Sequence, residues 1–163
     1  MTEDDSDLPA ALRLLGDGGH LMLDGVPHAM ALGFKLVDLR RDHAIVKVPY
    51  REELIGNPET GVIHGGVITS LLDNTSGLAV ICALDELWPT ATLDLRIDYM
   101  RPARPHTDVF AHAHCYKVAR SIAFVRAAAY EETEEDPVAT SHGAFMLKDN
   151  GGSGAAGGGE AGS

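Results

Sequence analysis

One long apolar segment dominates the middle of the chain. Between residues 65 and 84, hydrophobic side chains recur at the spacing of one broad helical face. An alternating pair of segments before it, residues 34–50, predicts a hairpin. Four more segments that read as strands follow it: about 91–100, 107–118, 121–131 and 137–147. Consecutive strands with short links favour an antiparallel meander, and one helix across one sheet is the simplest packing, so the sequence predicts an α+β domain.

The segment at 91–100 alternates most clearly. Its apolar residues fall on one face of the predicted strand: Leu93, Leu95, Ile97 and Tyr99. Its polar residues fall on the other: Thr92, Asp94, Arg96 and Asp98. This period of two is typical of a strand with one face against the core.

The ends of the chain differ from this middle part. Residues from about 9 to 31 hold apolar residues at mixed helical spacing, interrupted by "GDGG" and by Pro27, and read as one or two short helices, so residues 1–30 are predicted to be an N-terminal helical segment. The Gly- and Ser-rich tail, residues 149–163, cannot bury apolar surface and is expected to be disordered. Residues 31–148 are therefore predicted to form the folded domain.

Charge and cysteine content restrict the partners and the compartment. The 163 residues carry a formal net charge of −11, which disfavours nucleic acid and anionic membrane surfaces as partners. No apolar run is expected to reach the roughly 18 residues of a membrane span, and no signal peptide is visible. Cys82 and Cys115 lack the spacing of a zinc site and are expected to be buried thiols. These features predict a cytoplasmic protein.

The stretch "NPETGVIHGGVITSLLDN", residues 57–74, places two glycines at the start of the long helix. The first N–H groups of a helix have no partner within it and lie at the positive end of its dipole. Gly65 and Gly66 could therefore donate to an oxygen that gains negative charge in a reaction. An equally good interpretation from spacing alone is that they only permit a tight turn from loop to helix.

Asp73 lies among leucines on the same helix, and Thr69 and Ser76 are predicted to share a narrow polar stripe with it. Burying a carboxylate costs free energy unless the group is paired or used. Asp73 is therefore either a structural hydrogen-bonding residue or a general base or nucleophile.

A distance restricts how Gly65 and Asp73 can act together. They are eight residues apart, which is about 12 Å along a helix axis. One carbonyl group cannot accept from the Gly65 N–H and also lie within about 3.5 Å of Asp73 of the same chain. Either the two residues act independently, or two chains related by a two-fold axis share each site.

The stretch "NPETGVIHGGVITSLLDNTSG" followed by "TLDLRIDYMRPA" resembles the hotdog-fold acyl-CoA thioesterases. The resemblance covers about residues 30–147 and is to the phenylacetate-pathway (PaaI-like) type of the 4-hydroxybenzoyl-CoA thioesterase superfamily. It implies a long helix wrapped by an antiparallel sheet and hydrolysis of an acyl- or aryl-CoA thioester without a cofactor. It also implies a homodimer with shared sites, usually paired again into a homotetramer. The acyl group is not identified.

Carried over residue by residue, the resemblance implies five roles. Gly65 matches the glycine whose N–H polarises the thioester carbonyl. Asp73 matches the carboxylate of the neighbouring chain that activates water or attacks directly. Asn57 matches an asparagine that positions the attacking group, although its spacing is one residue longer than in some members. Thr92 matches a position near the carboxylate, and His64 lies beside the site, more readily as a structural hydrogen-bonding residue than as the base.

A basic segment could hold the phosphates of coenzyme A. Residues 96–126 contain six arginine or lysine residues and only two aspartates, which would attract an anion locally in an acidic chain. Scattered solvated cations are an equally good interpretation for any one of them. Arg126 alternates with apolar residues and is instead a candidate to pair with a carboxylate in the sheet. The favoured CoA-binding residues are Gly66, Arg101, Arg104, Lys117, Arg120 and Ser121.

Other functions are less well supported. Gly77 stands one turn after Asp73, where other hotdog thioesterases carry a glutamate, and no Gly-x-Ser-x-Gly motif indicates a serine hydrolase. A hydratase would need a catalytic histidine beside a carboxylate, and His64 is too far from Asp73 in one chain. His112 and His114 share one strand face but lack a third ligand, so no metal site is predicted. A non-catalytic acyl-CoA-binding regulator on the same fold is the alternative.

Overall fold

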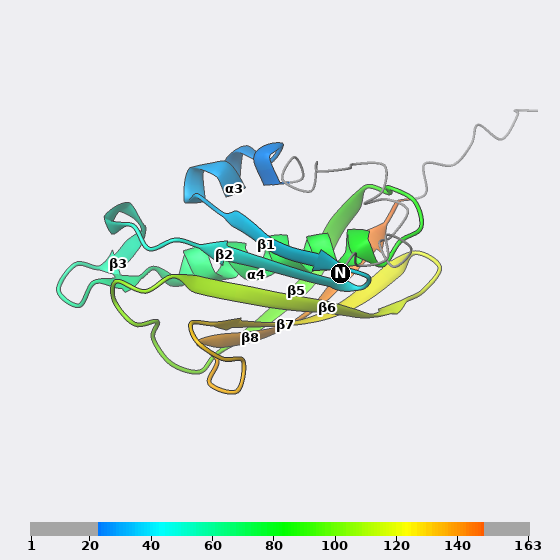
Figure 1. Ribbon diagram of the computed structural model, residues 1–163. Helices are drawn as coiled ribbons and strands as arrows, with labels where there is room; N and C mark the ends of the chain where they lie inside the picture. Colours follow the sequence, from blue (N-terminus) through cyan, green and yellow to red (C-terminus); the bar gives the residue numbers. More distant parts are fainter. Residues whose placement is uncertain (1–22, 149–163) are drawn as a thin grey trace, which may run out of the picture.

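The computed structural model describes residues 23–148 (Figure 1). The predicted tail and the first 22 residues of the predicted N-terminal segment lie outside the described residues. The elements follow one another in this order: α3 (Pro27–Leu32), β1 (Lys35–Arg40), β2 (His43–Val48), η3 (Glu52–Leu54), β3 (Ile55–Asn57), β4 (Val62–Ile63), α4 (Gly65–Cys82), β5 (Thr90–Tyr99), β6 (Val109–Val118), β7 (Ile122–Tyr130) and β8 (Ala139–Leu147).

Six of these strands form one antiparallel sheet in the order β1-β2-β6-β7-β8-β5, and β3 pairs with β4. The predicted meander is therefore correct for β6, β7 and β8 but wrong for β5, which pairs with β8 at the far edge. The reason is that β2 pairs with β6 over six consecutive residues and occupies the side that a simple meander would give to β5. Strand β5 consequently ends the sheet.

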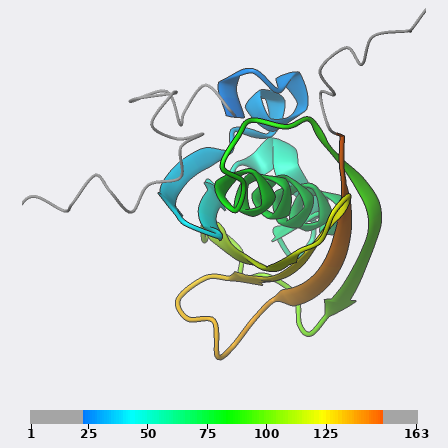
Figure 2. The same ribbon diagram turned by 90° about the vertical axis from the view of Figure 1, so that its right-hand side faces the viewer.

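The sheet curves around α4, as the view along the helix shows (Figure 2). Most of the inward-facing residues of β6 and β7 are alanines, and Val109, Cys115 and Val125 are the larger ones among them. The buried alanines are Ala111, Ala113, Ala123, Ala127 and Ala129. Short side chains let the helix approach the sheet closely, and the larger apolar side chains of α4 fill the space between them. The core thus lies between one helix and the concave face of one sheet, as the sequence predicted.

Helix α4 is long and apolar enough to span a membrane, contrary to the expectation that no apolar run has that length. However, 56% of this 18-residue segment is buried inside the protein. The same composition suits the core helix of a domain, because a helix wrapped by a sheet is apolar over most of its circumference.

The sheet leaves one stripe of α4 uncovered. Gly65, Thr69, Asp73 and Gly77 lie along it at i, i+4 spacing. Ser76, predicted to share the stripe, is instead buried and only 1% exposed. The uncovered residues follow the i, i+4 row, which is inclined to the helix axis. Ser76, seven residues after Thr69, does not belong to this row, and at its height along the axis the sheet covers it.

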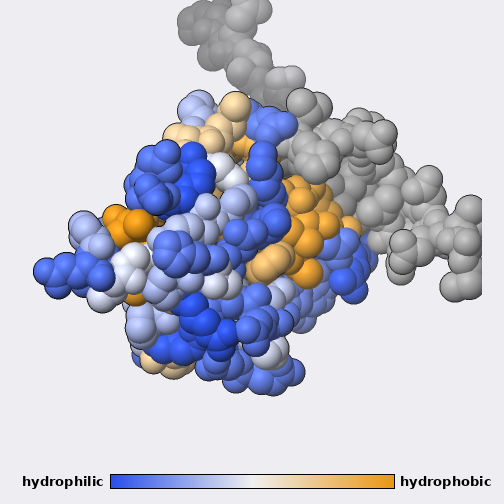
Figure 3. All heavy atoms as spheres, turned by 60° about the vertical axis from the view of Figure 1, so that its left-hand side comes forward, coloured by the Kyte–Doolittle hydropathy of each residue, from blue (hydrophilic) through white to orange (hydrophobic). Residues whose placement is uncertain are grey.

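The edge formed by β5 is more apolar than an exposed strand usually is. Leu93, Tyr99 and the adjoining Met100 are 54%, 51% and 57% exposed. By contrast, a different side of the molecule, drawn in Figure 3, is mostly hydrophilic, with apolar side chains gathered in one larger patch. A ten-residue edge with large apolar side chains is a ready template for pairing with another strand.

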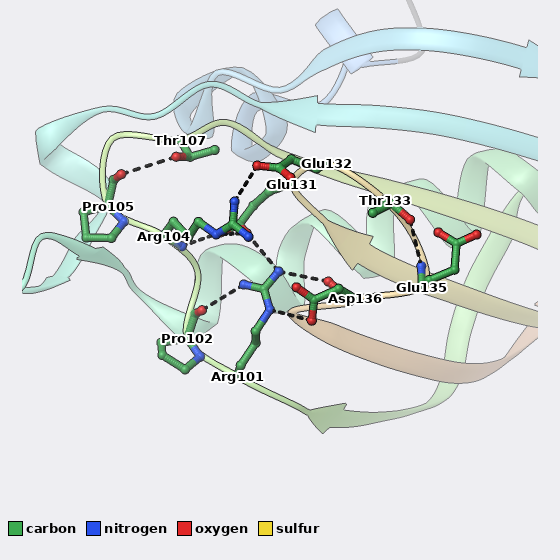
Figure 4. A network of polar contacts seen from close by, with 10 residues as sticks. All are labelled: Arg101, Pro102, Arg104, Pro105, Thr107, Glu131, Glu132, Thr133, Glu135 and Asp136. Atoms are coloured by element: carbon green, nitrogen blue, oxygen red, sulfur yellow. Dashed lines mark hydrogen bonds and ion pairs between the residues drawn. The ribbon is translucent and has the colours of Figure 1, made fainter.

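A buried carboxylate fixes the link between β5 and β6. The side chain of Glu131 is fully buried and accepts the backbone N–H of Arg104. It also pairs with the Arg101 guanidinium at 2.9 Å (Figure 4). Asp136 and Glu132 pair with the same two arginines from the loop between β7 and β8. The hydrogen bond to Glu131 is the main cause of the raised pKa of Arg101.

We expect Glu131→Gln to lower the free energy of unfolding by about 2 kcal/mol or more, because it leaves the Arg101 charge beside a buried neutral amide. Glu132→Gln removes the same charge from a side chain that is 71% exposed and should cost less than about 1 kcal/mol. Urea unfolding at one fixed protein concentration measures both. Equal losses would show that burial of Glu131 is not what stabilises this link.

Candidate functional site

The start of α4 is fixed by His64. Its Nδ1 accepts the N–H of Gly66 at 2.9 Å, which makes it the N-cap of the helix, and its own N–H donates to the Leu54 carbonyl. Strand β3 passes directly beneath, because a Cβ at Gly56 would lie 2.7 Å from the His64 Cα. Only glycine fits such an approach. The geometry is that of a structural hydrogen-bonding residue, the favoured interpretation of His64.

The two glycines at the helix start differ in their hydrogen bonds. The Gly66 N–H is taken by His64, and the Val67 N–H donates to the His64 carbonyl at 2.9 Å. The Gly65 N–H has no acceptor among residues 23–148. Gly65 therefore offers a donor at the positive end of α4, whereas the donor of Gly66 is already used.

A cavity of about 400 Å³ opens beside Gly65, and Ile68, Tyr99 and Arg101 are among its lining residues. The Tyr99 hydroxyl donates to the Gly65 carbonyl at 2.7 Å and lies 2.8 Å from Thr69 Oγ1. The alternating pattern of residues 91–100 predicts only that Tyr99 lies on the apolar face of a strand, because no local pattern shows which hydroxyl reaches a helix start. We call Gly65, Tyr99 and this cavity the Gly65 half-site.

Asp73 lies on α4 above the beginning of β5. The Thr92 Oγ1 donates to Asp73 Oδ1 at 2.8 Å. This contact contradicts the face predicted for Thr92, which was grouped with Asp94 and Arg96. The register of β5 shifts between Thr92 and Asp94, so Thr92 pairs with the buried Phe145 on the helix side while Asp94 stays outside. A β-bulge of this kind reverses the alternation of every residue beyond it.

Asp73 and Thr92 line a second cavity of about 240 Å³. Most of its other lining residues are apolar, and two come from the segment before α3: Leu23, Val26, Leu78, Ile81 and Phe145. Gly77 also lines it, where a glutamate would enter the space. We call Asp73, Thr92 and this cavity the Asp73 half-site. Asp73 and Thr92 form its polar end, and the apolar residues form its wall.

The two half-sites have no lining residue in common. The structure thus does not bring the Gly65 N–H and the Asp73 carboxylate together within one chain. Asn57 belongs to neither lining; it lies in the β3–β4 turn before α4, where its Oδ1 accepts the Glu59 N–H at 3.0 Å. Its side chain is exposed and shapes this turn.

The predicted CoA-binding cations fall into two groups at opposite ends of β5. Arg101 and Arg104 follow its last residue and pair with Glu131, Glu132 and Asp136. The second group comprises Lys117, near the end of β6, and Arg120, in the turn between β6 and β7, where the predicted CoA-binding residue Ser121 also lies. This turn adjoins the start of β5, because the Ser121 carbonyl accepts the N–H of Leu147, which pairs with Thr90. Each half-site has one group near it.

Neither cysteine is suited to nucleophilic catalysis. Burial raises the pKa of Cys82 to about 12 and that of Cys115 to about 11, so the reactive thiolate is scarce at neutral pH. Both thiols are free and buried, as expected from the sequence. Within residues 23–148, no group of three or more His, Cys, Asp or Glu side chains is arranged to hold a metal ion.

Comparison with known proteins identifies the family. The family described as "Thioesterase superfamily" matches residues 60–138. The medium/long-chain acyl-CoA thioesterase YigI of Escherichia coli K12 is 32% identical over 107 residues, which are 58% of this chain and 67% of YigI.

Solved structures agree. A Pseudomonas aeruginosa protein is 42% identical with a TM-score of 0.72, covering 77% of this chain and 93% of that one. A mutant of the phenylacetic acid degradation protein PaaI of Thermus thermophilus is 28% identical with a TM-score of 0.65, covering 74% and 98%. The hotdog fold and the PaaI-like resemblance predicted from the sequence are confirmed. The chain belongs to the thioesterase superfamily.

Proposed function

We propose that the protein is an acyl-CoA thioesterase whose active sites are each built from the Gly65 half-site of one chain and the Asp73 half-site of another. The observation that carries this proposal is that an open N–H donor and a carboxylate lie on one uncovered stripe of α4 but in separate cavities. Membership of the thioesterase superfamily and the likeness to YigI support the reaction class.

The edge strand β5 supports the homodimer. Tyr99, at its end, binds the Gly65 carbonyl, and Thr92, near its start, binds Asp73. If two β5 edges pair antiparallel about a two-fold axis, the start of one strand lies beside the end of the other. The Asp73 half-site of one chain then adjoins the Gly65 half-site of its partner, and the exposed apolar residues of the edge are covered.

The reaction follows from these groups. The thioester carbonyl oxygen accepts from the Gly65 N–H, where the helix dipole stabilises the charge that develops on it. Asp73 of the partner subunit takes a proton from water, which adds to the carbonyl carbon, or attacks that carbon itself to form an anhydride that water then hydrolyses. The C–S bond breaks, and the thiolate leaves and gains a proton to give CoA. Thr92 orients the carboxylate by binding Oδ1.

The two ends of the substrate have different surroundings in this arrangement. The apolar wall around Asp73 suits the acyl group. Lys117 and Arg120 suit the CoA phosphates best, because neither has a carboxylate partner within residues 23–148 whereas Arg101 and Arg104 are neutralised. Two buried free thiols agree with the reducing cytoplasm as the compartment. Pairing of two dimers into a homotetramer stays a prediction from the family resemblance.

Asp73→Asn should lower kcat by about 100- to 10,000-fold, because it removes the base while keeping the size of the side chain. Thiol release from a panel of aryl-, short-chain and long-chain acyl-CoAs measures this and identifies the preferred acyl group. Asp85→Asn, at a carboxylate that is 81% exposed after α4, is the matched control and should keep full activity. Saturable acyl-CoA binding without thiol release by the unmodified protein would instead indicate the non-catalytic regulator.

Gly65→Pro tests the N–H donor directly. Proline fits the first position of a helix, and His64 before it has the extended ψ of 136° that proline requires. The change removes the N–H and should lower kcat by about 100- to 1,000-fold. Gly65→Ala keeps the N–H and places its Cβ at an ordinary 3.4 Å from the Tyr99 hydroxyl, so it should stay within about tenfold of full activity. Similar losses in both variants would argue against the donor role.

Mixing the two inactive proteins tests whether the site is shared. After subunit exchange between Asp73→Asn and Gly65→Pro, about half of the dimers are mixed and each has one intact site, so roughly a quarter of full activity should return. If each site belonged to one chain, no activity would return. That result would overturn the shared site without affecting the assignment as a thioesterase.

A further inference from the structure

The outer face of the sheet, opposite α4, carries a row of basic and histidine side chains. Neighbouring strands place them opposite one another in the ladder, one from each of the six strands: Arg40, His43, His114, Arg126, His142 and Arg96. The row contains no carboxylate. In a chain with a net charge of −11, such a row is a local reversal of charge.

The ends of the row are neutralised and its centre is not. Arg40 pairs with Asp38 at 2.5 Å, and Arg96 pairs with Asp98 at 3.0 Å. Arg126, between His114 and His142, pairs with no carboxylate of residues 23–148; its guanidinium lies 4.5 Å from the centre of the Tyr116 ring. The alternative that Arg126 pairs with a carboxylate in the sheet is therefore wrong.

A cavity of about 480 Å³ lies over this centre, and it is larger than either half-site cavity. We call it the outer-face cavity. Its charged and titratable lining residues are His43, His112, His114, Arg126, Glu134 and His142. A cavity of this volume is within the range that holds small molecules.

The one carboxylate in the lining is already engaged. Glu134 lies 2.7 Å from His112 Nδ1, and His112 Nε2 lies 2.9 Å from His43 Nδ1. The rings of His43 and His114 stack at 4.2 Å. Burial, followed by the nearness of His114 and His112, lowers the pKa of His43, so positive charge accumulates here only at a cost. An anion in the cavity would offset that cost.

The same contacts disfavour a metal ion. Both ring nitrogens of His112 are in hydrogen bonds, and no three ligating side chains of residues 23–148 are arranged for a cation. Arg126 adds a permanent positive charge that repels a cation and suits an oxyanion, which a guanidinium can bind through two hydrogen bonds.

We propose that the outer-face cavity is a ligand site separate from both half-sites, which binds a phosphate-type dianion through Arg126 and protonated His43, His114 and His142. It is independent of thioester hydrolysis. The ligand is either free phosphate or the phosphoryl group of a larger molecule, for which the cavity has room.

The pH dependence of this site has a definite sign. A bound dianion raises the pKa of the histidines around it, so its affinity increases as the pH falls through the histidine range and is lowest above it. The other charged groups near the cavity are arginines and carboxylates. They are Asp38, Arg40, Asp42, Arg96, Asp98, Arg126 and Glu134.

Calorimetric titration with sulfate tests the proposal, because sulfate keeps its charge over this range. At constant ionic strength set with sodium chloride, sulfate should bind at least about fivefold more tightly near pH 6 than near pH 8. Inorganic phosphate and adenosine monophosphate distinguish the two sources. Tighter binding of the nucleotide identifies a phosphoryl group on a larger molecule, and equal binding identifies the free anion.

Variants assign the binding to the cavity. Arg126→Gln should weaken sulfate binding by about tenfold or more. His142→Gln changes an exposed side chain and should reduce the pH dependence without unfolding, which circular dichroism checks. Lys35→Gln removes one charge from the same face, beside Lys47 and two rows from the cavity, and should have no effect.

Two results would overturn the proposal. One is the absence of saturable binding of sulfate and phosphate, including the case in which only zinc binds. The other is an equal loss of sulfate affinity in Lys35→Gln and Arg126→Gln, which would show that the anion is attracted non-specifically by the charge of this face.

Discussion

The close packing of α4 against the alanine-lined concave face of the sheet is the constraint on which the other features depend. It needs mostly small residues at the inward positions of β6 and β7, and it leaves only one side of α4 uncovered, where Gly65, Thr69, Asp73 and Gly77 lie next to Gly66, Ser70 and Asn74. The polar groups that the helix offers for chemistry lie on that side. The 12 Å or so between Gly65 and Asp73 then follows from helical rise alone, and no side-chain movement can remove it. Two chains are thus the simplest way to complete a site.

Local sequence patterns predicted the helices and strands themselves. They did not predict the order of the strands in the sheet, which depends on pairing between distant segments. The helix predicted at 65–84 is observed at Gly65–Cys82, and the strand predicted at 121–131 at Ile122–Tyr130. The predicted place of β5 in the sheet was wrong, because the sequences of β2 and β5 do not show which of the two strands pairs with β6. The orientation of Thr92 was also not predictable, because the regular alternation of apolar and polar residues gives no sign of the β-bulge that turns Thr92 toward Asp73.

The candidate site was predictable to the extent that its chemistry lies in one continuous stretch. Gly65, His64 and Asp73 could be found because a glycine pair at a helix start and a carboxylate among leucines are local anomalies. The Tyr99 hydroxyl and the pairing of Arg101 with Glu131 could not, because each joins segments that are at least 30 residues apart. His112 and His114 were visible as a pair, but His43 and Glu134, which complete the cavity around them, come from other strands and loops.

Strand register couples the inner and outer faces of the sheet. In β6, Ala111 and Ala113 face α4 while His112 and His114 face outward, so a shift of one residue would place histidines against the helix and alanines in the outer-face cavity. The penalty for burying those imidazoles beneath α4 therefore helps to select the register that also aligns Arg126 and His142 with them. The basic row costs the isolated chain some repulsion at its centre, where no carboxylate of residues 23–148 pairs with Arg126. A fold under no functional demand could remove that repulsion with a single substitution, and this argues that the row serves a ligand.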